Sequence, residues 1–205
     1  ALGDGARLVV KAGASLDSSN HEGSALSPIF EVAREESSGP LHRVYFSAAS
    51  SSQVPSYTAL NSSATAGLFR GNPNLGREKS HNFELGASGT AAGWAAQAAV
   101  FYRQDKNLVD WTFRQGVTAR TANAVDIETT GAEFVVRHSW ATCDLVLGYT
   151  VLGKHHDYRG APVDASFYAL NYARQRLTAA IVVRLGREFE VRMDNAARIQ
   201  APNLL

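Results

Sequence analysis

Polar and apolar residues alternate one by one along many segments of this chain. Every second residue from Leu177 to Leu185 is apolar, and the segment from Phe189 to Asp194 alternates apolar with charged residues. Successive side chains of a β-strand point to opposite faces, so each segment predicts a strand with one wet and one dry face. The same pattern recurs at 43–48, 82–88, 132–137 and 143–151. Further strands are predicted at 7–15, 27–34 and 94–103, with a short one near 108–113.

The connections between these segments alternate between short and long. Short turns are predicted at 37–40, 88–93, 141–142 and 185–187. Long links are predicted at about 16–25, 52–79, 104–121 and 154–170. A membrane-spanning barrel keeps its short turns on one side and its long loops on the other, whereas a soluble sandwich has no reason to do so. The rhythm favours an all-β fold, an antiparallel transmembrane β-barrel.

Segment length and aromatic placement agree with a membrane barrel. Many segments reach about nine or ten residues, the length with which a tilted strand crosses a bilayer. Aromatic residues gather near segment ends, as interfacial girdles require; they are Trp94, Tyr102, Trp111, Trp140 and Tyr149. A soluble antiparallel sheet with one buried face would alternate in the same way, so the pattern alone leaves that alternative open.

Composition removes several classes of function. The 205 residues carry 20 Lys and Arg against 19 Asp and Glu, a net charge of +1 that gives no sign of a nucleic-acid partner. No stretch approaches the roughly 18 to 20 continuous apolar residues that a membrane helix needs. This excludes membrane-spanning helices but not a barrel, because barrel strands alternate apolar and polar residues. Cys143 is the only cysteine, so the chain has no intramolecular disulfide, and a small apolar role is favoured for it.

Residues typical of catalysis or metal binding are few. His155, His156 and Asp157 form the one cluster with metal-ligand chemistry. Adjacent histidines on an extended chain point apart and no further ligand lies nearby, so a solvated loop is favoured and no metal or cofactor is predicted. The serines at 47–52 lack the G-x-S-x-G elbow of a nucleophile, and no carboxylates show paired acid–base spacing. We therefore predict that the chain is not an enzyme.

The region from Ser52 to Gly86 carries the most distinctive motifs. It reads PSYTAL at 55–60, GNPNL at 71–75 and EKSHNFELG at 78–86. This succession resembles the mid-barrel signature of TonB-dependent outer-membrane receptors. Three more stretches are similar to the family in the same order: 98–103 with 107–111, 123–133 and 171–177. Two positions depart from the pattern, since Arg77 stands where the family usually has proline and Gln53 where an arginine often precedes the P-S element.

The resemblance implies a bacterial outer-membrane location and an incomplete barrel. Residues 1–205 would form one partial β-barrel domain of about nine or ten strands out of a barrel of about 22, without plug or terminal strands. Its partners would be membrane lipid, the remaining strands and plug of the parent receptor, and the TonB complex through that plug. Glu84 and Glu133 would face the wet lumen, and Gly131 would suit a strand entry that needs close approach or an unusual backbone angle.

The resemblance also implies a function in import. The parent receptor would take up a large, scarce nutrient such as a cobalamin, a siderophore–iron chelate or a glycan, held by the plug and the extracellular loops. The candidate ligand residues are therefore loop positions, namely Arg70, Asn72, Trp111, Arg114 and Tyr158. The alternative is a small non-transporting barrel or an oligomeric sheet that only binds or anchors. Because unpaired strand edges cannot face lipid, the chain must close, oligomerise or pair with further strands.

Overall fold

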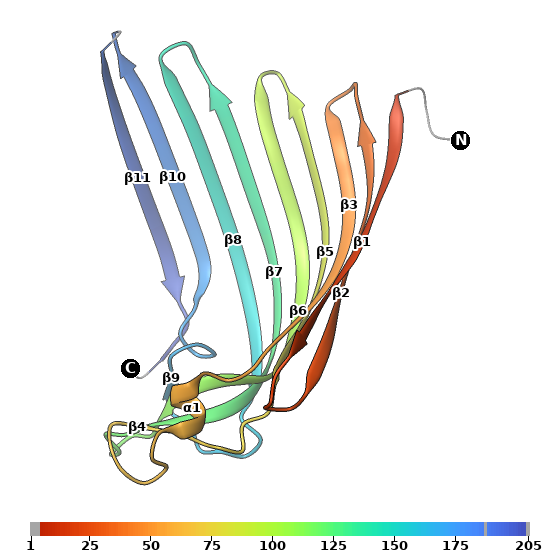
Figure 1. Ribbon diagram of the computed structural model, residues 1–205. Coiled ribbons are helices and arrows are strands. Elements are labelled where there is room, and N and C mark those ends of the chain that lie inside the picture. The colour runs from red at the N-terminus through yellow and green to blue at the C-terminus, as the bar shows by residue number, and fades with distance from the viewer. Residues whose placement is uncertain (1–4, 187, 204–205) are drawn as a thin grey trace.

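Nine long strands form one curved antiparallel sheet in the computed structural model, which describes residues 5–186 and 188–203 (Figure 1). Each strand pairs with the next one along the chain. The strands are β1 (Ala6–Ser18), β2 (Ser24–Glu36), β3 (Leu41–Gln53), β5 (Glu78–Ala91), β6 (Trp94–Phe113), β7 (Arg120–Ser139), β8 (Cys143–Asp157), β10 (Ala173–Leu185) and β11 (Phe189–Gln200). Two short strands, β4 (Phe69–Arg70) and β9 (Ala165–Ser166), and helix α1 (Tyr57–Asn61) lie in the links.

Short turns and long links lie at opposite ends of the sheet, as predicted (Figure 1). We call them the hairpin end and the loop end. The antiparallel all-β fold is confirmed, and the sheet does not close on itself within the described residues, because β1 and β11 each have a partner on one side only. Several predicted boundaries were too wide: the turn predicted at 88–93 is only 92–93, and the link predicted at 16–25 is 19–23. The link predicted from 154 begins only at 158, so His155, His156 and Asp157 lie at the end of β8 and not in the predicted loop.

The link predicted at 104–121 is much shorter and spans only 114–119. Strands β6 and β7 each run for 20 residues, so the predicted short strand at 108–113 is the continuation of β6. Pairing of Asp105 with Ile127 is followed directly by pairing of Leu108 with Val125. The two intervening residues of β6 form a bulge, in which Asn107 has a φ of 56°. A bulge shifts the alternation by one residue, so a period of two cannot be followed through it.

The outer face of the sheet is apolar and exposed. One register row crosses six strands through Val32, Phe46, Leu85, Val100, Ala132 and Val151. Leu85 and Val100 in the middle of this row are each 53% exposed. Contiguous apolar surface of this kind marks a face that meets lipid or another apolar partner. We call this surface the apolar band.

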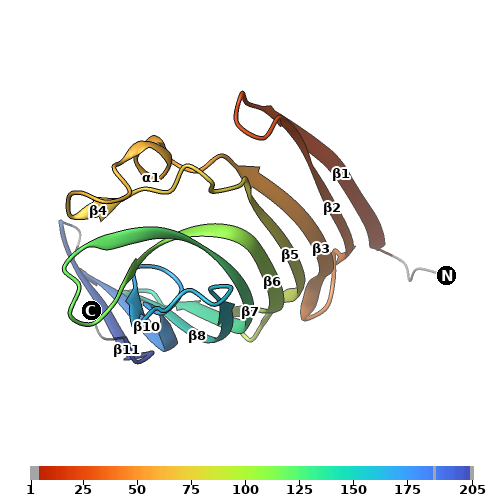
Figure 2. The same ribbon diagram turned by 90° about the horizontal axis from the view of Figure 1, so that it is seen from below.

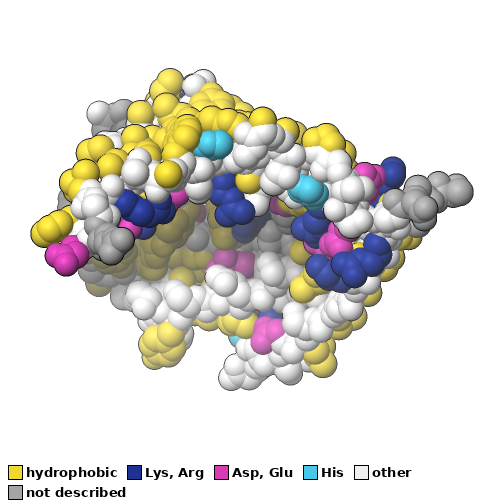
Figure 3. Space-filling model, turned by 90° about the horizontal axis from the view of Figure 1, so that it is seen from above, with side chains coloured by type: hydrophobic (Ala, Val, Ile, Leu, Met, Phe, Trp, Pro, Cys, Tyr) yellow, Lys and Arg dark blue, Asp and Glu magenta, His cyan; other side chains and the backbone are white. Residues whose placement is uncertain are grey.

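Charged side chains gather inside the trough on the concave face, among hydrophobic ones (Figure 3). The Tyr45 hydroxyl donates to Glu84 at 2.5 Å, and Glu31 pairs with both Lys11 and Arg43. Glycines admit the larger side chains of this face, because a Cβ on Gly86 would meet the ring of Tyr45. A Cβ on Gly131 would likewise meet Phe101 and Leu152, so close approach is confirmed there, inside β7.

The packed core lies at the loop end. One cluster joins Val125, Ile127, Tyr158 and Ala169, and a second joins Ala59, Leu75 and Ala122. Both clusters hold loops against the ends of β6 and β7. Among the described residues, no helix is long and apolar enough to cross a membrane.

Candidate functional site

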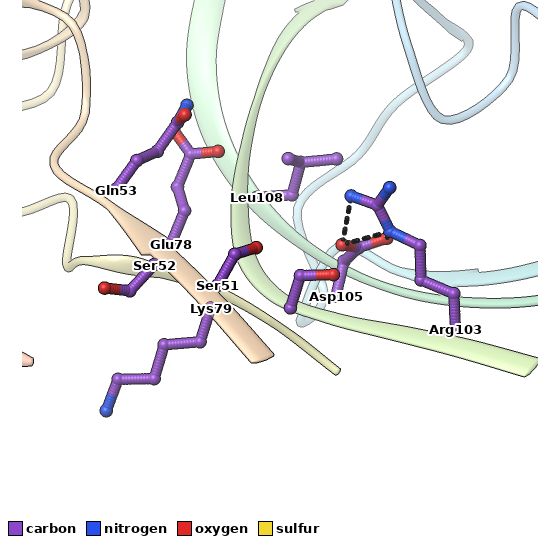
Figure 4. Close-up of a pocket in the computed structure, with 9 residues that line it drawn as sticks. Ser51, Ser52, Gln53, Glu78, Lys79, Arg103, Asp105 and Leu108 are labelled. Atoms are coloured by element: carbon purple, nitrogen blue, oxygen red, sulfur yellow. Dashed lines mark hydrogen bonds and ion pairs between the residues drawn. The ribbon is translucent and has the colours of Figure 1, made fainter. Parts of the chain in front are cut away.

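A polar cavity of about 230 Å³ lies at the loop end, where β3, β5 and β6 run side by side (Figure 4). It is lined by Ser51, Ser52, Gln53, Glu78, Lys79, Ser80, Arg103, Asp105 and Leu108. Asp105 and Arg103 come from β6 just before its bulge, whereas Glu78 opens β5 opposite Gln53 of β3. In Figure 4, Lys79 extends away from Asp105, as alternation along a strand requires.

Two buried carboxylates dominate the electrostatics of this cavity. Asp105 is 5% exposed and accepts from Arg103 Nε at 2.9 Å, with a second guanidinium contact at 2.7 Å. Burial raises the pKa of the Glu78 carboxyl, and the charge of Asp105 adds to this rise, while hydrogen bonds from Gln53 and from the Val109 backbone oppose it. The cavity thus offers hydroxyls, an amide, a guanidinium and two carboxylates to a polar ligand.

Asp110 anchors the link between β8 and β10 next to this cavity. Its carboxylate is fully buried and accepts three hydrogen bonds, from the Tyr158 hydroxyl at 2.9 Å and from the N–H groups of Tyr168 at 3.1 Å and Ala169 at 2.9 Å. Burial raises the pKa of the Tyr158 hydroxyl, so it stays a donor. One side chain therefore fixes both ends of a long loop.

Asp126 forms a second anchor at the β6 bulge. It accepts from the N–H of Asn107 at 3.0 Å and pairs with Arg159 at 2.7 Å and Lys106 at 3.3 Å. Burial alone would raise the pKa of Asp126, but these hydrogen bonds and the Arg159 charge outweigh it and lower the pKa. The bulge and the loop after β8 are thereby held together.

The turn between β1 and β2 is latched onto the link before β5. His21 Nε2 lies 2.8 Å from the carbonyl oxygen of Leu75. Arg77 is 2% exposed, donates to the carbonyl of Gly23 at 2.7 Å and forms an ion pair with Asp17. These contacts tie the β1–β2 turn to the link before β5.

None of the five candidate residues lines the cavity. Asn72 is half-buried and donates its N–H to the Ala59 carbonyl at 2.7 Å. Half-buried Arg70 lies in β4, beside β7. Trp111 meets Phe69 edge to face at 5.2 Å, so the structure brings these three predicted positions to one region.

The other two candidates lie apart from that region. Arg114 is exposed beside a second cavity of about 200 Å³ near Pro162, and Tyr158 is buried against Asp110. Sequence reasoning missed Glu78, Arg103 and Asp105. Glu78 and Arg103 stand within the motifs that carried the family resemblance, and alternation along β6 places Asp105 on the face of Arg103. The shared face of Arg103 and Asp105 was the signal in the sequence that could have identified these residues.

No group of three or more His, Cys, Asp or Glu side chains within residues 5–186 and 188–203 could hold a metal ion. His155 and His156 lie in β8, where alternation sends their side chains to opposite faces. The chemistry that the cavity offers is hydrogen bonding and charge.

A meander of long strands, apolar outside and polar inside with its loops gathered at one end, defines a segment of a large β-barrel wall. The family model described as TonB dependent receptor-like, beta-barrel matches residues 7–192, and the chain belongs to this family. Receptors of this family are outer-membrane β-barrels with a transport role. None of the curated proteins matches the sequence.

Solved structures agree on the fold. The siderophore receptor PirA from Pseudomonas aeruginosa superposes with a TM-score of 0.67 at 17% identity, covering 93% of this chain and 34% of the receptor. PirA from Acinetobacter baumannii gives 0.64 at 15% identity, with 98% and 33% covered. The FrpB iron transporter from Neisseria meningitidis gives 0.59 at 18%, with 84% and 26% covered. The chain thus spans about a third of the length of the PirA receptors.

Proposed function

We propose that this chain forms part of the wall of a bacterial outer-membrane receptor that imports a large, scarce nutrient. The apolar band meets lipid, the polar trough faces the lumen, and the loop end is extracellular. The plug of the parent receptor fills the trough and transmits energy from the TonB complex. Residues 1–205 are one partial barrel domain in this proposal.

The observation that carries the proposal is the polar cavity at the loop end. It opens where the strands continue beyond the apolar band, so a ligand arriving from outside meets it first. Buried Glu78 and Asp105 offer hydrogen-bond acceptors there, and the Arg103 guanidinium and the Ser51 hydroxyl offer donors. Buried polar groups of this kind discriminate between ligands, because the wrong ligand leaves them unpaired.

We favour a siderophore-bound iron chelate over a cobalamin or a glycan. Solved structures that are similar in fold include siderophore receptors and an iron transporter. The cavity adds both donors and acceptors, which suit the amide and hydroxyl groups on the periphery of such chelates. The loop candidates Arg70, Asn72, Trp111, Arg114 and Tyr158 shape the surrounding entrance in this proposal.

The alternative is a small module that binds or anchors without transporting. The outer edges of β1 and β11 have no strand partner within the described residues. Such edges are not stable in lipid, so this rival needs closure or oligomerisation by the chain alone. We favour pairing with further strands of a larger barrel.

The test uses the full-length receptor that carries this segment, with Glu78→Gln and Asp105→Asn as variants. We expect each to weaken binding of its ferric chelate by about 10-fold, the cost of one buried hydrogen bond to a charged group. Ferric hydroxamate, ferric catecholate, cyanocobalamin and maltodextrin serve as probes. The control is Asp164→Asn, an exposed loop carboxylate outside the cavity. Unchanged binding of all four probes in both variants contradicts the cavity's role, and a water-soluble monomer contradicts the barrel.

A further inference from the structure

A further cavity lies on the rim, where β2 and β3 separate. Their pairing runs from Glu35 with Arg43 to Ile29 with Ala49 and then stops, although both strands continue toward the loop end. Figure 2 shows the β1–β2 hairpin leaning away from β3 and β5 at this end. The gap encloses about 410 Å³. Backbone groups that pair elsewhere in the sheet have no strand partner here.

Two buried polar atoms beside this gap have no hydrogen-bond partner within the part of the chain that the structure describes. They are Nε of Arg77 and Oγ of Ser52, and both residues line the cavity. Arg77 is 2% exposed, and its two terminal nitrogens are engaged by Asp17 and Gly23. A buried guanidinium with a spare donor is costly unless an acceptor completes it.

Two further nitrogen-bearing side chains, of which Lys79 is a cation, complete the wall of the cavity. Lys79 and His81 both line the cavity from the outer face of β5, and Ser50 Oγ lies 2.8 Å from His81 Nδ1. One carboxylate, Glu22, also lines the cavity, but it accepts the N–H of Arg77 at 3.2 Å and is thereby engaged. Ammonium, guanidinium and hydroxyl groups together are the donors that recognise a phosphate.

The apolar band begins directly below this wall. His81 is followed two residues along the same face by Phe83, which is 44% exposed, and Leu26, 67% exposed, lines the cavity itself. A ligand with a phosphate group and acyl chains would contact both the polar wall of the cavity and the apolar band, whereas free phosphate would contact only the polar wall. Amphiphilic ligands therefore fit the site better than a soluble anion.

We propose that this cavity binds the phosphate headgroup of a lipid in the outer leaflet of the membrane. Lys79 neutralises the phosphate, Nε of Arg77 and Oγ of Ser52 donate hydrogen bonds to it, and the acyl chains run down the apolar band. This inference rests on the proposed membrane placement. Basic side chains at a membrane surface contribute about five-fold each to the binding of anionic lipid.

The test uses the full-length receptor in nanodiscs of phosphatidylcholine with or without lipid A, and counts retained lipid A by native mass spectrometry. We expect Lys79→Gln to lower lipid A affinity about five-fold. The matched control is Lys11→Gln, a lysine of the concave face that pairs with Glu31 and is expected to have no effect. Ser52→Ala tests the site without changing charge, and a smaller loss of affinity is expected.

The outcomes separate this inference from the proposed function. Equal affinity of wild type and Lys79→Gln for lipid A overturns the lipid site, as does inorganic phosphate competing as well as lipid A. Retention of dephosphorylated lipid A at the same level also overturns it. Failure of the receptor to enter nanodiscs overturns the membrane placement itself, whereas normal insertion and chelate binding with an indifferent Lys79→Gln sinks only the lipid site.

Discussion

Replacing Asp110 by asparagine tests whether one buried carboxylate holds the loop between β8 and β10. The change keeps the shape of the side chain but turns one acceptor oxygen into a donor. Two hydrogen bonds survive when the amide oxygen takes the place of Oδ2, which accepts from Tyr158 and Ala169, and the N–H of Tyr168 then faces another donor. A lost hydrogen bond to a charged acceptor costs about 1.5–3 kcal/mol. We expect local opening to become easier by about 2–3 kcal/mol.

The assay is amide hydrogen exchange of peptides that cover residues 165–172, measured in detergent. An opening free energy lowered by about 2–3 kcal/mol speeds exchange by roughly 30- to 150-fold. Asp164→Asn is the matched control, since that exposed carboxylate accepts only the N–H of Gln115 at 2.7 Å, and it is expected to change exchange by less than about five-fold. If the exchange of Tyr168 and Ala169 in Asp110→Asn matches wild type, the loop is held by its apolar contacts and our reasoning is refuted.

Three further predictions follow from contacts at other points of the sheet. Gly131→Ala overpacks the concave face and should lower the free energy of unfolding by about 1–3 kcal/mol. Gly13→Ala, which has open space around its Cβ position, should leave it unchanged, and thermal unfolding of both variants in detergent tests this difference. Because the folded-state pKa of Asp126 is lowered, its carboxylate stabilises the fold at pH values above the usual carboxyl pKa of 3.8, and this stability is lost as the pH falls through the folded-state pKa. Hydrogen exchange of the Asn107 amide that stays unchanged as the pH falls through the folded-state pKa contradicts this prediction. Arg77→Met should free the β1–β2 turn to proteolysis, and equal cleavage rates in variant and wild type would refute the latch.

Much of the sheet could be predicted because alternation reports directly on faces. Segments such as 177–185 and 143–151 keep a strict period of two, and both lie in strands whose outer face is apolar. The prediction of strands from alternation failed where the period of two is interrupted. At the β6 bulge Asn107 adopts a positive φ, and the apolar residues beyond it continue the strand on a shifted phase. A local pattern cannot separate that shift from the start of a loop.

The candidate site was predicted less well because its residues face inward from different strands. Glu78 and Asp105 are 27 positions apart in the chain, as their numbers show, and only the register of β5 against β6 brings them to one cavity. Loop position suggested Tyr158 as a ligand residue. Its burial against Asp110 gives it a structural contact instead, which depends on a partner 48 residues away.

Position 77 shows how a departure from the family pattern acquires a physical meaning. A proline there would have no N–H to donate to Glu22 and no guanidinium to reach Asp17 and Gly23. The arginine therefore connects the β1–β2 turn to the link before β5 in a way that proline cannot. Because its partners lie 54 to 60 residues earlier in the chain, the sequence reveals the departure but not the latch. Within the described residues the Nε of the same arginine has no hydrogen-bond partner beside the rim cavity, so this departure from the family pattern serves both the latch and the proposed lipid site.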